Sequence, residues 1–231
     1  MSSPNMKLLT TVARALGSFS QEVVFVGGTT VPLYLQNPAS PEVRPTDDVD
    51  CIIELSGYAS YAQLEAQMRR LGFEHDHAPK APICRWLVEG IKVDLMPTSS
   101  EILGFTNRWY KSGVANKVPS VLSDGQTIFI LSAPFFVATK LEAFLNRGQG
   151  DFHLSSDIED IISVIDGRET LFTEIKAAPP DLTAYLAEHF GSFAKHADFR
   201  ESLEGFLPAA REGLGRQQRA LAVVEGIAKL C

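Results

Sequence analysis

The sequence predicts an α/β (α+β) fold. A mixed β-sheet with flanking helices is expected over residues 1–132, and a C-terminal helical domain over residues 133–231. In the first part, short β-branched and aromatic runs alternate with segments of helical spacing. After Pro134, which suits the first turn of a helix, only helical spacing follows. A chain of 231 residues is long enough to bury a core under such a sheet.

The elements of the first part are set by apolar spacing and by the glycines and prolines that end each pattern. Thr29 or Thr30 would cap the short helix that follows the first strand. A loop with three prolines leads to the second strand, and the aromatic face of the next helix, Tyr58 included, is expected in the core. The expected elements are a helix over 5–17, a strand over 23–26, a short helix over 31–36, a strand through Asp48 and Asp50, a helix over 58–71, a short strand over 73–76, strands over 83–88 and 91–96, and a hairpin over 118–131.

Composition excludes several classes of protein. No apolar run approaches the roughly 18 residues that a membrane span needs, and the N-terminus lacks a secretory signal pattern, so no membrane partner is expected. The 3 cysteines are odd in number and lack metal-type spacing, which favours a reducing, cytoplasmic location. A net charge of −7 argues against a protein that coats nucleic acid but leaves a local basic groove open.

Two adjacent glycines end the first strand and predict a ligand site. Gly27 and Gly28 stand where the backbone must turn sharply or approach a ligand closely. The start of the next helix would present free N–H groups and a positive dipole end, and Thr29 adds a hydroxyl. The turn is therefore a candidate phosphate site.

Three aspartates in strand-like segments predict a metal site. Asp48 and Asp50 would share one strand face, where two carboxylates repel unless a cation lies between them. Asp94 lies within a later apolar strand, where an acid is unfavourable without a partner. Oxygen ligands suit Mg²⁺ or Mn²⁺. A solvated strand edge, or Asp94 paired with Lys92 or Arg85, is the alternative.

The glycine turn, the Asp48-Val49-Asp50 pair and Asp94 together resemble the nucleotidyltransferase fold related to polymerase β. The order of these motifs along the chain and their separations match that fold. The resemblance implies a nucleotidyltransferase-type mixed sheet, and metal-dependent transfer of a nucleoside monophosphate from an NTP to an acceptor hydroxyl.

A narrower resemblance, over residues 22–168, is to the AbiEii/AbiGii toxin family of nucleotidyltransferases. It is carried by Arg44-x-Thr46-x-Asp48, by the segment from Ala138 to Arg147, and by Ser156 to Ile161. The family more often has a small residue and Leu after the Gly-Gly-Thr turn, where this chain has Thr30-Val31. The resemblance implies a toxin opposed by an antitoxin protein, with the 3′ end of tRNA or another RNA as acceptor.

The resemblance also implies roles for individual residues. Asp48 and Asp50 would bind the metal ions, and Asp94 would bind a metal or act as the base. Residues implied in catalysis are Asp48, Asp50, Asp94, Lys140 and Asp160, and residues implied in nucleotide binding are Gly27, Gly28, Thr29, Arg44, Lys140, Arg147 and Asp157. Two other functions stay open: a catalytically idle nucleotide-binding or partner-binding module, and a small-molecule nucleotidyltransferase of the antibiotic-modifying type.

Overall fold

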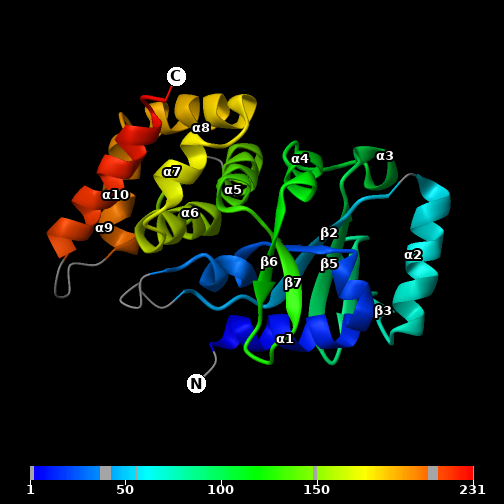
Figure 1. Cartoon of the computed structure of the whole chain (residues 1–231). Helices are drawn as coiled ribbons and strands as arrows, with labels where there is room; N and C mark the ends of the chain where they lie inside the picture. The colour runs from blue at the N-terminus through cyan, green and yellow to red at the C-terminus, as the bar shows by residue number, and fades with distance from the viewer. Residues whose placement is uncertain (1–2, 37–42, 56, 148–149, 208–212, 231) are drawn as a thin grey trace. The chain divides into compact units, whose positions relative to one another are not determined.

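The computed structural model describes residues 3–36, 43–55, 57–147, 150–207 and 213–230 (Figure 1). The chain divides into two compact units, one of residues 1–33 and 44–132 and the other of residues 34–43 and 133–231. Two of the three loop prolines, Pro38 and Pro41, lie outside the described residues.

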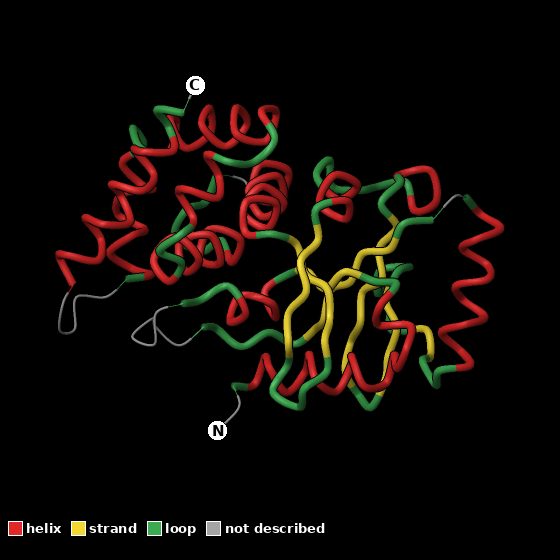
Figure 2. The backbone as a smooth tube through the Cα atoms, viewed as in Figure 1, coloured by secondary structure: helices red, strands yellow, loops and turns green. Residues whose placement is uncertain are grey.

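Within the described residues, the first unit is built on a seven-stranded sheet in the order β3-β4-β5-β2-β1-β7-β6 (Figure 2). The strands are β1 (Val24–Val26), β2 (Asp48–Ile53), β3 (Glu74–His75), β4 (Arg85–Val88), β5 (Ile91–Pro97), β6 (Lys117–Val121) and β7 (Thr127–Leu131). β2 pairs parallel with β5, and β1 pairs parallel with β7, while the remaining pairs are antiparallel. The predicted mixed sheet is therefore confirmed.

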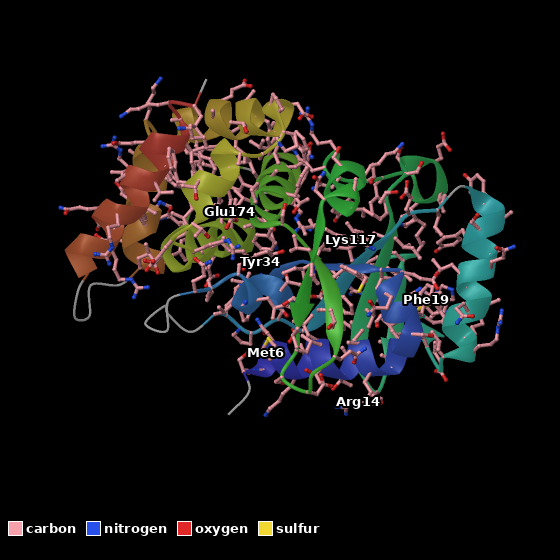
Figure 3. All side chains as sticks on the ribbon, viewed as in Figure 1. Met6, Arg14, Phe19, Tyr34, Lys117 and Glu174 are labelled. Atoms are coloured by element: carbon pink, nitrogen blue, oxygen red, sulfur yellow. The ribbon has the colours of Figure 1, made fainter. Side chains whose placement is uncertain are left out.

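The helices of this unit are α1 (Pro4–Leu16), η1 (Gly17–Gln21), η2 (Gly28–Leu33), α2 (Tyr58–Arg70), α3 (Ser100–Leu103) and α4 (Tyr110–Ala115). Ser3 caps α1, which packs against β2 and β5. Arg14 of α1, labelled in Figure 3, donates a hydrogen bond to Asp124 in the β6–β7 turn. The sequence prediction for α2 is wrong in one respect, because Tyr58 is 69% exposed and only Leu64 and Met68 of this helix are fully buried.

The short helix after the glycines also differs from its prediction. It is a 3₁₀ helix that starts at Gly28, so Thr29 and Thr30 lie inside it and neither precedes it as a cap. Thr30 instead donates from its N–H and its hydroxyl to the Gly27 carbonyl, at 3.2 and 2.8 Å. Pro32 explains the difference, because it has no N–H to complete an α-helical bond to Gly28.

The second unit is helical among its described residues. Its helices are α5 (Ala133–Arg147), α6 (Ser156–Gly167), α7 (Leu171–Lys176), α8 (Pro180–Phe193), α9 (Ala197–Phe206) and α10 (Gly213–Ile227). Tyr34 belongs to this unit and packs on Phe136 with ring centroids 4.5 Å apart. The predicted helical region is confirmed. None of the helices among the described residues has the length and apolar character needed to cross a membrane.

Candidate functional site

Three carboxylates converge on one face of the sheet in the first unit. β2 and β5 pair in parallel with Asp50 opposite Asp94, so these side chains emerge on the same face. Asp48, two residues before Asp50, lies on that face too. One oxygen of each of the three carboxylates lies within 4.8 Å of the others. Asp94 is buried, while Asp48 and Asp50 are partly exposed. The predicted convergence of these acids is therefore present.

The glycine turn touches this acidic triad of Asp48, Asp50 and Asp94. Gly27 has φ +75°, a conformation that L side chains rarely adopt. A Cβ atom at Gly27 would lie 1.9 Å from Oδ2 of Asp50, so this carboxylate occupies the space where a side chain would stand. The turn therefore needs glycine both for its backbone angle and for the position of Asp50.

Thr29 contributes the second feature of the turn. Its side chain is 1% exposed, and its Oγ1 atom has no hydrogen-bond partner among the described residues. Burying a hydroxyl without a partner costs about 1–3 kcal/mol, and such atoms are rare in native proteins. An orphaned donor beside the glycine turn fits a ligand that supplies the missing oxygen.

Arg85 forms the direct protein contact to two members of the triad. It lies opposite Asp94 in the antiparallel β4–β5 pair. Its Nε and Nη2 atoms donate to the two Asp94 oxygens, both at 2.7 Å, and Nη2 lies 3.5 Å from Asp48 Oδ2. The hydrogen bonds to Asp94 raise the pKa of the Arg85 guanidinium, so the charge is permanent. The sequence prediction gave this pairing as an alternative to a metal site, whereas in the structure Asp94 pairs with Arg85 and is also a member of the triad.

Asn5 is a second residue that the sequence prediction missed. This buried side chain of α1 donates to the Arg44 carbonyl at 3.0 Å and accepts from the Thr46 N–H at 3.1 Å. The two bonds fasten the segment that leads directly into Asp48. Asn5 therefore positions the start of β2, and Arg44, predicted to bind nucleotide, lies at this anchor point.

The residues present fit a hard divalent cation. Carboxylate oxygens are the ligands that Mg²⁺ and Mn²⁺ prefer. Three carboxylates and one guanidinium leave a formal charge of −3 + 1 = −2 on the cluster. The partly exposed side chain of Asp48, at 38%, leaves the cluster open to solvent.

The remaining predicted residues form a charged cluster in the second unit. Lys140 of α5 is buried, and its Nζ lies 3.1 Å from Asp157 and 2.7 Å from Asp160, both on α6. Arg147 reaches Asp157 with Nε and Nη2, both at 3.1 Å. Although burial alone would raise the pKa of Asp157, Lys140 and Arg147 hold it below its usual value. Arg147, which the resemblance implied in nucleotide binding, thus orients an acid in this structure.

The buried thiols near the triad are poorly suited to chemistry. Burial raises the pKa of Cys51, and the Asp50 and Asp94 carboxylates add to the shift. Burial and Asp94 raise the pKa of Cys84 to about 11. Since the thiolate is the reactive form, both cysteines are inert near neutral pH.

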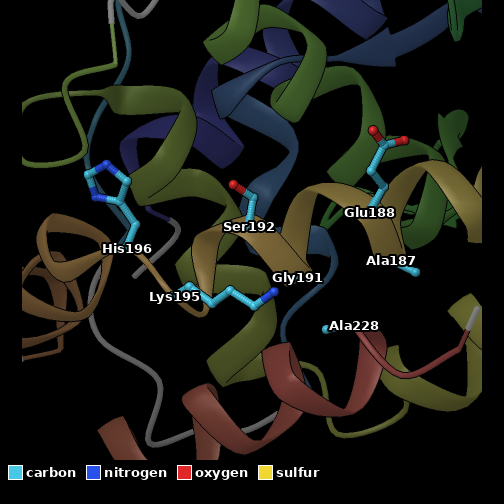
Figure 4. A pocket seen from close by; sticks show the side chains of 7 residues that line it. All are labelled: Ala187, Glu188, Gly191, Ser192, Lys195, His196 and Ala228. Atoms are coloured by element: carbon cyan, nitrogen blue, oxygen red, sulfur yellow. The ribbon is translucent and has the colours of Figure 1, made fainter.

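A surface groove in the second unit holds none of the predicted residues. It lies between α8 and α10, and Figure 4 shows Glu188, Ser192, Lys195 and His196 along it. Gly191 and Ala228 bring the two helices close together, because a Cβ at Gly191 would lie 3.7 Å from that of Ala228. The charged side chains along this groove do not converge on one point, so they do not form a candidate site.

Comparisons with known proteins add little to this geometry. No protein-family model matches the chain, and no curated protein matches its sequence. Among solved structures, it is similar to an antigenic nucleotidyltransferase-like protein from Paracoccidioides brasiliensis, with 17% identity and a TM-score of 0.49 over 94% of each chain. At these values neither an activity nor a site residue transfers to this chain. The AbiEii/AbiGii resemblance stays a prediction.

Proposed function

We propose that this chain is a metal-dependent nucleotidyltransferase that moves a nucleoside monophosphate from an NTP to an acceptor hydroxyl, with pyrophosphate leaving. The observation that carries the proposal is the convergence of Asp48, Asp50 and Asp94 beside the Gly27 turn. Carboxylates suit a divalent cation and a tight glycine turn suits a phosphate, so the two side by side suit a metal-bound triphosphate.

The triad would hold the metal. Asp48 and Asp50 are the more exposed ligands, and Asp94 is the buried one. Bound Mg²⁺ or Mn²⁺ would neutralise the triphosphate charge and polarise the attacking hydroxyl. Asp94 keeps both oxygens hydrogen bonded to Arg85, which favours a ligand role for Asp94 over that of a base that must turn toward the acceptor.

The turn would hold the phosphates. Gly27 and Gly28 allow close approach of the backbone, and the Thr29 hydroxyl would donate to a phosphate oxygen. This contact would satisfy the Thr29 hydroxyl, a buried side-chain atom that has no hydrogen-bond partner among the described residues. Arg44, Lys140, Arg147 and Asp157 join the nucleotide-binding set, and Asp160 the catalytic set, on the strength of the family resemblance.

The proposal extends to the acceptor and to the biological role. The AbiEii/AbiGii resemblance leads us to propose an RNA 3′ end as acceptor, with tRNA first, a toxin role, and an antitoxin protein as partner. The net charge of −7 does not favour broad RNA binding, so contact with RNA would be confined to a local surface.

The test is transfer of label from α-³²P NTPs, with Mg²⁺ or Mn²⁺, to tRNA, total RNA and small hydroxyl compounds. We expect Asp48→Asn to abolish transfer, because it removes a charged ligand. Asp47→Asn is the matched control, since this exposed neighbour lies outside the triad and its loss should leave transfer unchanged.

The outcomes separate the candidate functions. Nucleotide binding without transfer to any acceptor would support an idle binding module, and label on a small molecule alone would support the antibiotic-modifying type. Failure of the wild type to bind any NTP–metal complex, in a titration that a known nucleotidyltransferase passes, would refute the proposal.

A further inference from the structure

Arg85 occupies a place in the triad that the proposed function leaves unexplained. A site meant to bind a divalent cation already contains a cation of its own. The guanidinium donates hydrogen bonds to both oxygens of Asp94 at 2.7 Å, and its Nη2 atom lies 3.5 Å from Oδ2 of Asp48. Its side chain is 18% exposed, so the pair is only weakly screened by solvent.

The hydrogen-bond geometry leaves room for a metal at Asp94. A carboxylate offers about four lone-pair positions, and the bidentate grip of Arg85 uses one on each oxygen. The same grip fixes the plane of the Asp94 carboxylate through a rigid fork. Arg85 therefore orders this ligand before any ion arrives.

The charge of Arg85 acts in the opposite direction. With Arg85 included, the negative charge that attracts a cation decreases from three units to two. The guanidinium also repels a divalent ion placed among the same carboxylates. A nucleotide triphosphate brings about four negative charges, which would outweigh that repulsion. The site thus favours an ion that arrives with nucleotide over an ion alone.

We propose that Arg85 is a positioning residue that keeps the affinity of the free protein for divalent ions low and makes tight ion binding depend on nucleotide. This inference rests on the metal-binding part of the proposed function. Without the guanidinium, the three carboxylates would bind the ion tightly whether or not nucleotide is present. Arg85 thus supplies the dependence on nucleotide.

The test is Mn²⁺ binding followed by electron paramagnetic resonance, with and without a non-hydrolysable NTP analogue. We expect Arg85→Gln to bind Mn²⁺ about tenfold more tightly than wild type without nucleotide, because a neighbouring like charge shifts such equilibria by about one to three powers of ten. Arg85→Lys, which keeps the charge, should stay within about threefold of wild type. The gain in affinity on adding nucleotide should be smaller in Arg85→Gln than in wild type.

Lys92→Gln is the control for charge alone. Lys92 is exposed and lies opposite Asp48 in the β2–β5 pair, so the substitution removes a positive charge from the same strands without removing a hydrogen bond from Asp94. We expect its Mn²⁺ affinity to stay within about threefold of wild type, as befits an exposed charge that solvent screens.

Each outcome separates the inference from the proposed function. Equal or weaker Mn²⁺ binding by a folded Arg85→Gln protein would overturn the inference and leave the nucleotidyltransferase proposal standing. Absence of Mn²⁺ binding by wild type even with nucleotide would overturn both. Should Arg85→Gln fail to fold, the ¹⁵Nε resonance of Arg85 in wild type decides: it should move on Mg²⁺ addition with nucleotide far more than without, and an equal response would overturn the inference.

Discussion

Replacing Gly27 by alanine tests whether the glycine turn and the triad form one site. The added Cβ would lie 1.9 Å from Asp50 Oδ2, where a normal contact between carbon and oxygen is about 3.3 Å, so the carboxylate must move by more than about 1 Å. The positive φ of +75° adds about 1–2 kcal/mol of backbone strain for any L residue. Overpacking of this kind costs about 1–3 kcal/mol. We therefore expect Gly27→Ala to lower the free energy of unfolding by about 2–5 kcal/mol.

Gly125→Ala separates backbone strain from the clash. Gly125 has a similar φ of +86°, but a Cβ there meets nothing within 4 Å. It should cost only the strain, about 1–2 kcal/mol, and leave Mn²⁺ binding with nucleotide unchanged. Gly27→Ala should weaken Mn²⁺ binding about tenfold or more, because a metal ligand has been displaced by more than a site tolerates.

A double-mutant cycle in urea denaturation completes the test. In an Asp50→Ala background the carboxylate is gone and only the Cβ of residue 50 remains, 3.0 Å from a Cβ at position 27, so Gly27→Ala should cost less than it costs in wild type. The reasoning is wrong if Gly27→Ala alone unfolds no more easily than Gly125→Ala and still binds Mn²⁺ normally, since Asp50 would then have no fixed relation to the turn.

Three further substitutions test other parts of the structure. Thr29→Val removes the buried, unpaired hydroxyl at nearly constant volume. Urea denaturation should therefore show a free energy of unfolding that is unchanged or raised by up to about 1 kcal/mol, and titration should show weaker NTP binding. A lower free energy of unfolding would contradict this interpretation. Asn5→Ala removes the hydrogen bonds to two part-buried backbone groups and should cost about 1–3 kcal/mol in the same assay, against less than about 1 for Asn116→Ala, whose hydrogen bond is exposed. Arg147 helps hold the pKa of Asp157 in the folded protein below its usual value. The ionised Asp157 therefore stabilises the fold fully at pH values above the unfolded pKa of about 3.9. This stabilisation is lost as the pH falls through the lower pKa of the folded state. Arg147→Gln should therefore move the acid-unfolding midpoint, followed by circular dichroism, to higher pH; an unmoved midpoint would contradict the pairing.

Local pattern was enough to predict the strands, and it also specifies one contact between charged residues that lie nine apart across a hairpin. The two-residue turn at Glu89-Gly90 pairs Val88 with Ile91, and counting outward by equal steps brings Arg85 opposite Asp94. The register of a hairpin therefore could have placed Arg85 in the site from sequence alone. The prediction treated that pairing as an alternative to metal binding, although a carboxylate has lone pairs for both.

Local spacing does not specify contacts between distant segments, so the placing of the glycine turn beside the three aspartates came from the family resemblance. The contact of Gly27 with Asp50 depends on the antiparallel pairing of β1 with β2, in which Val26 lies opposite Asp50. No local spacing specifies that pairing. Asn5 likewise looks like any polar residue at a helix start, because its partner, the Thr46 N–H, lies 41 residues away. By contrast, Pro32 was a readable signal against the α-helix predicted after the glycines.

The two charged clusters differ in side-chain exposure and in net charge. Side-chain exposure is 5% for Asp157 and 2% for Asp160, against 38% for Asp48. The formal charges of Lys140, Arg147 and their two aspartates sum to +2 − 2 = 0, whereas the triad with Arg85 keeps −2. This neutral cluster, in which only the Arg147 side chain is exposed, at 70%, holds α5 against α6, because removing Lys140 would leave the buried Asp160 carboxylate without this ion pair. The triad with Arg85 has the exposed carboxylate and the net negative charge that a cation needs, whereas Lys140 and Asp160 form a buried ion pair whose proposed nucleotide-binding and catalytic roles rest on the family resemblance.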